Sequence, residues 1–230
     1  MTRRTNARVA GITFLLYIAI GISALIFSSR ATHGEGIAAK LASVARHATD
    51  ARVAFLLELS TCFCALVLAV TLYAITRDQD RDLALLGLIC RVGEGLMSGA
   101  AIPKSLGLIW LATATGANAP DAQTANTLGT LFLKAAGGGI GAIFFAVGST
   151  IFSWLLLRGR MIPVALAWLG VLASLLAAVG LPLMLVDFIP DSLEWFIWIP
   201  LLLFEVPLAV WLIAKGVAMP ARSSSPLATG

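Results

Sequence analysis

The sequence predicts an all-α protein, a polytopic membrane bundle of six transmembrane helices, and two observations carry this prediction. Of the 230 residues, 59% are hydrophobic and 12% are charged, whereas soluble globular proteins carry about 25% charged residues. A soluble domain of this length could not bury that much apolar surface in one core. Six continuous apolar stretches are also long enough to cross a bilayer, for which a helix needs about 20 residues.

The predicted spans cover residues 9–27, 53–75, 83–112, 128–157, 161–186 and 195–214. Each span must be helical, because lipid offers no partner to backbone N–H and C=O groups. Most connections are short, which favours an up-and-down bundle. We expect residues 1–217 to form a single six-span membrane domain and residues 218–230 to form a disordered C-terminal tail.

The first loop, residues 28–50, is the one long connection. Within it Ile37, Leu41 and Val44 recur at helical spacing, on the side opposite Lys40 and Arg46. This pattern predicts a short amphipathic helix. Two interpretations stay open, a helix that lies on the outer surface of the bilayer and an ordinary solvated loop helix.

Basic residues outside the spans indicate the orientation of the chain. With the N-terminus in the cytoplasm, nine basic residues lie in cytoplasmic segments: Arg3, Arg4, Arg8, Arg77, Arg81, Arg158, Arg160, Lys215 and Arg222. Four lie in outer segments: Arg30, Lys40, Arg46 and Arg52. Because cytoplasmic loops carry an excess of Lys and Arg, we expect both termini inside. The abundant Arg and Ala favour a prokaryotic gene, so we expect a multi-pass protein of the bacterial inner membrane.

Several function classes find no support in the sequence. The net charge of +4 is small and not gathered in one patch, so we expect no nucleic-acid partner. Both histidines, His33 and His47, lie in the first loop, which excludes a bis-histidine haem within the bundle and an HExxH zinc site in a span. Cys62 and Cys64 are only two residues apart and point to different faces of a helix. We therefore expect no catalytic set, cofactor or metal.

Ionisable residues within the spans are the most informative feature. A charge near the bilayer centre costs about 2.5–3.5 kcal/mol on insertion scales. Three acidic and three basic residues occur there, and the equal count favours pairing inside the bundle: Glu58, Arg91, Glu94, Lys104, Lys134 and Glu205.

Two clusters follow from the depth and spacing of these residues. Arg91 and Glu94 are three residues apart and share a helix face, which Ser98 continues. Glu205 lies near the middle of the sixth span, so these residues predict a central polar cluster. Glu58 with Lys134 or with Lys104 is the second predicted pair, although Lys104 lies close enough to a span end to reach the interface instead.

Glycine and proline add to the description of these helices. Gly95 with Gly99, and Gly137 with Gly141, form two GxxxG pairs, which predict that the third and fourth spans are direct neighbours. Pro200 and Pro207 bracket Glu205. A carboxylate beside such a kink is suited to hold a cation or a proton, but prolines in spans also serve packing alone.

Three segments carry a resemblance to a known family: residues 7–11 (ARVAG), 83–94 (LALLGLICRVGE) and 204–216 (FEVPLAVWLIAKG). With them the chain resembles the bacterial membrane proteins grouped as domain of unknown function four-three-eight-six, over about residues 7–217. The resemblance implies a six-span inner-membrane protein, and it implies no activity.

The main functional hypothesis is a polar intramembrane site that binds or passes a small solute, ion or proton, built from Arg91, Glu94, Glu205, Glu58, Lys134 and Ser98. One alternative is a non-catalytic structural or accessory membrane protein whose ion pairs serve assembly. A second is an intramembrane enzyme, although the spans hold no nucleophile–base pair, zinc set or paired-aspartate motif. A homo-oligomer is compatible with the sequence.

Overall fold

The structure, a computed structural model, describes residues 2–116, 119–134 and 139–218. All its regular elements are helical, as the sequence predicts. They are α1 (Arg3–Ala31), α2 (Ile37–Arg46), α3 (Ala48–Thr76), α4 (Arg81–Ala100), α5 (Ile102–Thr113), α6 (Ala122–Lys134), α7 (Gly139–Arg158), α8 (Val164–Leu185) and α9 (Glu194–Ala214), the last preceded by the short 3-10 turn Asp191–Leu193.

Six helical segments are long and apolar enough to cross a membrane, which confirms the predicted number: α1, α3, α4 with α5, α7, α8 and α9. At a rise of 1.5 Å per residue, the 29 residues of α1 and of α3 extend about 43 Å. The 20–22 residues of α7, α8 and α9 extend about 30–33 Å, which matches the roughly 30 Å of a bilayer's hydrocarbon core.

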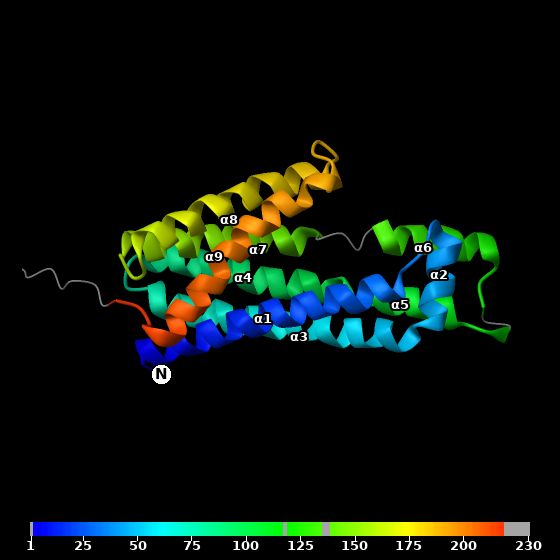
Figure 1. The fold of residues 1–230 in the computed structure, drawn as a ribbon, viewed down its shortest axis with the longest axis horizontal. Coiled ribbons are helices and arrows are strands. Elements are labelled where there is room, and N and C mark those ends of the chain that lie inside the picture. The colour runs from blue at the N-terminus through cyan, green and yellow to red at the C-terminus, as the bar shows by residue number, and fades with distance from the viewer. Residues whose placement is uncertain (1, 117–118, 135–138, 219–230) are drawn as a thin grey trace, which may run out of the picture.

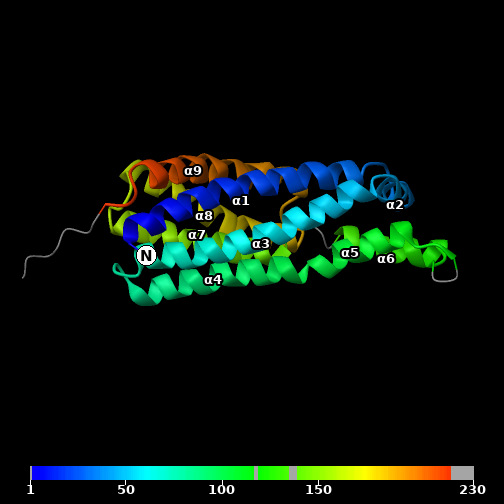
Figure 2. The ribbon, with the colours of Figure 1, turned by 90° about the horizontal axis from the view of Figure 1, so that it is seen from below.

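The spanning helices form a closed ring in chain order. α1 packs on α3, α3 on α4, α4 on α7, α7 on α8, α8 on α9, and α9 returns to α1. Figure 1 and Figure 2 show α4, α7, α8 and α9 gathered around the half of α1 and α3 that holds the N-terminus, which we call the N-terminal end. The shorter helices α2, α5 and α6 lie together at the far end. Neighbours in sequence are thus neighbours in space, as an up-and-down bundle requires.

One predicted span is divided, and a second is described in two parts. The third, predicted as one helix over residues 83–112, is interrupted at Ala101, where α4 ends and α5 begins with Pro103 in its first turn. Proline lacks the N–H that would continue the preceding helix. The fourth, predicted over 128–157, consists of α6 and α7, and residues 135–138 lie outside the described structure. Gly139, the first residue of α7, has a φ of 51°, a left-handed conformation that occurs at helix ends and not in the interior of a right-handed helix.

The helix α2 lies within the first loop, at the residues whose periodicity predicted a helix. Its apolar side contacts α6, because a Cβ on Gly129 would come within 3.0 Å of Ile37 Cγ2 and 3.2 Å of Leu41 Cδ1. Val44 is fully buried. The apolar residues of α2 therefore pack against protein, and a position on the bilayer surface stays a prediction. The predicted disordered tail, 218–230, lies outside the described residues from 219 onward.

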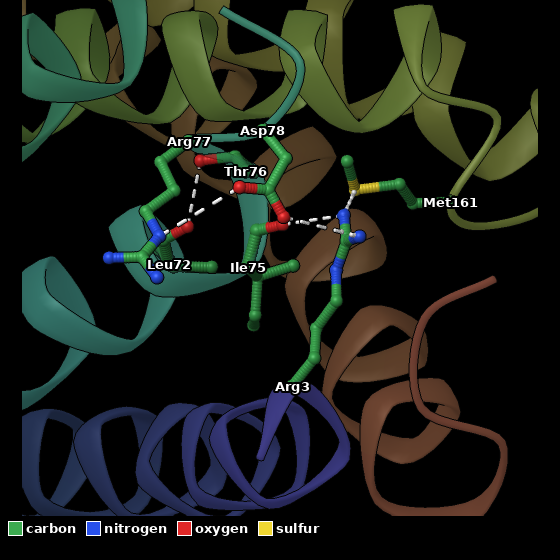
Figure 3. A network of polar contacts seen from close by, with 7 residues as sticks. All are labelled: Arg3, Leu72, Ile75, Thr76, Arg77, Asp78 and Met161. Carbon is green, nitrogen blue, oxygen red and sulfur yellow. Dashed lines mark hydrogen bonds and ion pairs between the residues drawn. The ribbon is translucent and has the colours of Figure 1, made fainter. Parts of the chain in front are cut away.

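A polar network joins the helices at the N-terminal end (Figure 3). Arg3 on α1 donates a hydrogen bond to the Ile75 carbonyl at the end of α3, at 2.7 Å. The same guanidinium lies 3.8 Å from the carboxylate of Asp78, which also faces Arg77 at 3.9 Å. The network also reaches Met161 between α7 and α8, at 3.5 Å from Arg3. The network thus joins the first turn of α1 to the end of α3 and to two interhelical connections, α3–α4 and α7–α8.

Close contact between α1 and α9 depends on Gly11. A Cβ at this position would lie 2.6 Å from the backbone carbonyl oxygen of Ala209 and 2.8 Å from Ile213 Cγ1. Backbone cannot yield as a flexible side chain can, so a side chain at residue 11 would push α9 away from α1. Gly21, ten residues further along the same helix, has nothing within 4 Å of the corresponding Cβ position.

We predict that Gly11→Ala destabilises the protein while Gly21→Ala does not. Overpacking costs about 1–3 kcal/mol, whereas Ala in place of an unhindered helical Gly gains up to about 1 kcal/mol. Thermal unfolding of the two purified variants in detergent measures the difference. Equal unfolding temperatures for the two variants would contradict the contact between α1 and α9.

Candidate functional site: a buried charge cluster and a far-end cavity

Arg91 and Glu94 form a buried ion pair on α4. Their Nη1 and Oε2 atoms lie 3.0 Å apart, and the two side chains are 0% and 3% exposed. A spacing of three residues places both on one helix face. Arg91 is ten residues, about 15 Å, from the start of α4, which is near the middle of a bilayer-spanning helix.

Tyr17 on α1 provides a second polar partner for the carboxylate of Glu94. Its hydroxyl donates a hydrogen bond to Glu94 Oε1 at 2.7 Å, a length typical of a charge-assisted bond. Sequence reasoning missed this residue, because a tyrosine in an apolar span resembles a packing residue. The available signal was that Tyr17 is one of only two tyrosines in the chain and the only one at mid-depth in a predicted span.

Arg91 is also enclosed by aromatic rings and a glycine. Its guanidinium carbon lies 4.9 Å from the centre of the Phe145 ring on α7 and 5.8 Å from that of the Tyr17 ring, both within cation–π range. A Cβ on Gly148 would come within 3.1 Å of Arg91 Cγ, so this glycine leaves room for the stem of the side chain. Among the described residues, Nε and Nη2 of Arg91 have no hydrogen-bond acceptor. The faces of the two aromatic rings lie near the guanidinium in place of an acceptor.

Glu205 on α9 is the third charged member. It is 6% exposed and lies within electrostatic reach of both Arg91 and Glu94. α9 runs through Pro200 and Pro207 as one helix. The structure thus brings together the three residues predicted for the central site. We call Tyr17, Arg91, Glu94 and Glu205, from α1, α4 and α9, the charge cluster.

A cavity of about 940 Å³ lies toward the far end of the bundle. Its polar lining consists of Ser28, Thr32, Lys40, Glu58, Thr61, Ser98, Lys104 and Ser105. Glu58 Oε2 accepts a hydrogen bond from Ser105 Oγ at 3.2 Å. Ser98 is four residues from Glu94 on α4, so the cavity reaches a residue about one helical turn from the charge cluster. We call this space the far-end cavity.

The structure describes only part of the second predicted pair, Glu58 with Lys134 or Lys104. Glu58 and Lys104 line the same cavity, and their direct pairing stays a prediction. The side chain of Lys134 lies outside the described residues, so its pairing with Glu58 stays a prediction. Ser105, which bonds to Glu58, was not predicted, since a serine near a span end carries no distinct signal in the sequence.

The glycines confirm that α4 and α7 are direct neighbours, but partly through other residues than predicted. A Cβ on Gly141 would lie 2.7 Å from Ser98 Oγ and 3.4 Å from the Glu94 carbonyl oxygen. The predicted pair Gly95 and Gly99 does not face α7: Gly95 packs on the Cys62 carbonyl of α3 at 3.1 Å, and Gly99 has nothing within 4 Å. On α4, Gly93 instead contacts α7, through Phe144. Gly137 lies outside the described residues.

Fold and site together define a class: helical, multi-pass proteins that carry an ion pair and a third acid between their spans. The chain belongs to the family described as "Domain of unknown function (DUF4386)", whose pattern matches residues 9–216. This match covers most of the chain and confirms the resemblance noted in the sequence. Neither the curated proteins nor the solved structures contain a match.

We predict that Tyr17→Phe destabilises the protein by about 1.5–3 kcal/mol, the range for a hydrogen bond to a charged group. Tyr73→Phe is the matched control, because the Tyr73 hydroxyl makes no hydrogen bond to a described residue and packs beside the core. Denaturant unfolding in detergent compares the two variants. Equal effects would show that the Tyr17–Glu94 hydrogen bond adds nothing to stability.

Removal of Arg91 should be far more costly than removal of an exposed arginine. Arg91→Met leaves Glu94 buried without its cation, for which we expect a loss of about 3–5 kcal/mol. Arg158→Met removes a guanidinium that is 54% exposed and lies 3.4 Å from Asp80, and should cost at most about 1 kcal/mol. The double variant Arg91→Met/Glu94→Gln should recover part of the loss. Unfolding midpoints measure all three, and a double variant no more stable than Arg91→Met would contradict the pairing.

Proposed function

We propose that this protein is an inner-membrane protein, with both termini in the cytoplasm, that binds or passes a small solute, ion or proton at the charge cluster. The far-end cavity then opens toward the outer side of the membrane. The observation that carries the proposal is that Ser98, which lines the far-end cavity, lies about one helical turn from Glu94 on α4. Its volume of about 940 Å³ falls within the range of ligand sites.

The lining of the far-end cavity suits a polar guest. Glu58 offers a carboxylate, Lys40 and Lys104 offer ammonium groups, and Ser98 and Ser105 offer hydroxyls. Ionisable residues within spans face the bundle interior or a water-filled space and typically mark pathways for substrates and ions. A guest that enters from the far end would meet these groups first and the charge cluster last.

A second candidate function is structural. The side chains of Arg91 and Glu94 are almost completely buried, which favours a contact sealed from solvent. In that case the ion pair specifies how α1, α4, α7 and α9 assemble, a role known for some buried polar groups. The two candidates differ in whether water reaches the cavity wall next to Glu94.

Thiol labelling separates the candidates. In a variant whose native cysteines Cys62, Cys64 and Cys90 are replaced by alanine, we predict that Ser98→Cys reacts with a membrane-impermeant methanethiosulfonate reagent added to the outer side of intact cells. Ser174→Cys is the matched control, since Ser174 is fully buried in α8 and bonds to the Gly170 carbonyl. Reaction of Ser98→Cys no faster than the control would contradict a water-reachable site, and reaction only from the cytoplasmic side would contradict the orientation.

A further inference from the structure

A small second cavity borders Glu205 on the side of the N-terminal end. Its volume is about 10 Å³, close to the space that one water molecule requires. Three polar side chains line it, those of Glu205 on α9 and of Ser149 and Ser153 on α7, and the rest of the wall is apolar. We call this space the serine chamber.

The two serines line the chamber from the same helix. Ser149 and Ser153 are four residues apart on α7 and share a helix face. Neither hydroxyl makes a hydrogen bond to a described residue, whereas Thr150 and Ser174 bond back to carbonyls of the preceding turn at 2.8 Å and 2.6 Å. A buried water needs two to four polar partners, and Glu205 with the two serines supplies three.

The charges of the cluster indicate which of its residues the chamber acts on. The cluster contains one base, Arg91, and two acids, Glu94 and Glu205. Arg91 is matched by Glu94 at 3.0 Å, and Tyr17 donates to that same carboxylate. α8, which also packs on α9, contributes no ionisable residue. Of the two acids of the charge cluster, Glu94 forms an ion pair and Glu205 forms none with a described residue. A buried carboxyl without an ion-pair partner favours its neutral, protonated form.

A proton fits this place better than a metal ion. The four side-chain oxygens around the chamber fall short of the six to eight oxygen ligands that Ca²⁺ takes and of the octahedral set that Mg²⁺ demands. Arg91, within electrostatic reach of Glu205, also repels a second cation. A protonated carboxyl is neutral, so this repulsion does not apply to it.

We propose that Glu205 carries an exchangeable proton, which it exchanges with a water molecule in the serine chamber. In this step the O–H bond of the carboxylic acid breaks, the water becomes hydronium and Glu205 becomes a carboxylate. Return of a proton or deuteron from that water to the carboxylate reverses the step and completes the exchange. The inference rests on the proposed function, since it names the proton as the ion that the charge cluster handles. The charge cluster then lies between two spaces, the far-end cavity on one side and the serine chamber on the other.

Infrared spectroscopy of the purified protein tests the proposal. We expect a carboxylic-acid carbonyl band that shifts when H₂O is replaced by D₂O and that Glu205→Gln removes. Glu58→Gln, a matched change at the acid of the far-end cavity, should leave this band in place. A band that survives in Glu205→Gln, or the lack of any such band in the unaltered protein, overturns the proposal. Loss of the band on addition of Na⁺ at constant pH also overturns it, in favour of a cation site.

The variant Ser149→Ala/Ser153→Ala tests the chamber without touching the acid. It should keep the intensity of the band but slow its deuterium exchange roughly five- to thirtyfold, as expected for the loss of one or both hydrogen bonds of about 1 kcal/mol each. This variant also tests the proposal if Glu205→Gln fails to fold. An unchanged rate of deuterium exchange would overturn the proposed proton exchange between Glu205 and the chamber water. If Ser98→Cys reacts with the outer reagent but the band does not depend on Glu205, only this inference fails. If Ser98→Cys does not react while the band depends on Glu205, the open site of the proposed function fails and the proton on Glu205 stands.

Discussion

The burial of Arg91 is the constraint on which the rest of this bundle depends. A guanidinium cannot lose its proton inside a protein, so its charge must be met where it lies. Glu94 meets it from the same helix at 3.0 Å, and the rings of Tyr17 and Phe145 meet it from α1 and α7. Gly148 supplies the space for its stem. Because these groups come from three helices, one buried side chain specifies the relative positions of α1, α4 and α7.

The sequence predicted the parts of this arrangement that carry a large energetic penalty. Charges within apolar spans are so costly that Arg91, Glu94 and Glu205 could be expected to meet, and the structure places them together. Tyr17, Phe145 and the serines of α7 escaped prediction because the same residue types are common as ordinary packing residues in helices. The number of spans followed from hydropathy, whereas the interruption at Ala101 depends on local backbone chemistry, which a span-length criterion does not detect.

The position of the far-end cavity follows from unequal helix lengths. α1 and α3 contain 29 residues each, while α8 and α9 contain 22 and 21, so the latter are about 10–12 Å shorter. The ring of six helices is therefore closed around the charge cluster but not along the whole of α1 and α3 (Figure 1). At the far end α2, α5 and α6 take the place of spanning helices, and the last residue of α8, Leu185, lines the cavity. The same constraint on length that keeps α8 and α9 within the bilayer leaves space beside Glu58 and Ser98.

The excess of acid over base bears on whether the cluster serves assembly or function. An ion pair that only orients helices needs one charge of each sign, and replacing such pairs by apolar residues is often neutral or stabilising. A third ionisable group at the same depth adds a desolvation cost without a matching partner. Glu205 bears this desolvation cost, because it is only 6% exposed. It lies beside a chamber lined by two serines whose hydroxyls bond to no described residue. This combination favours the proposed proton site over a purely structural cluster, because a group that gains and loses a proton next to a fixed cation needs no second ion-pair partner.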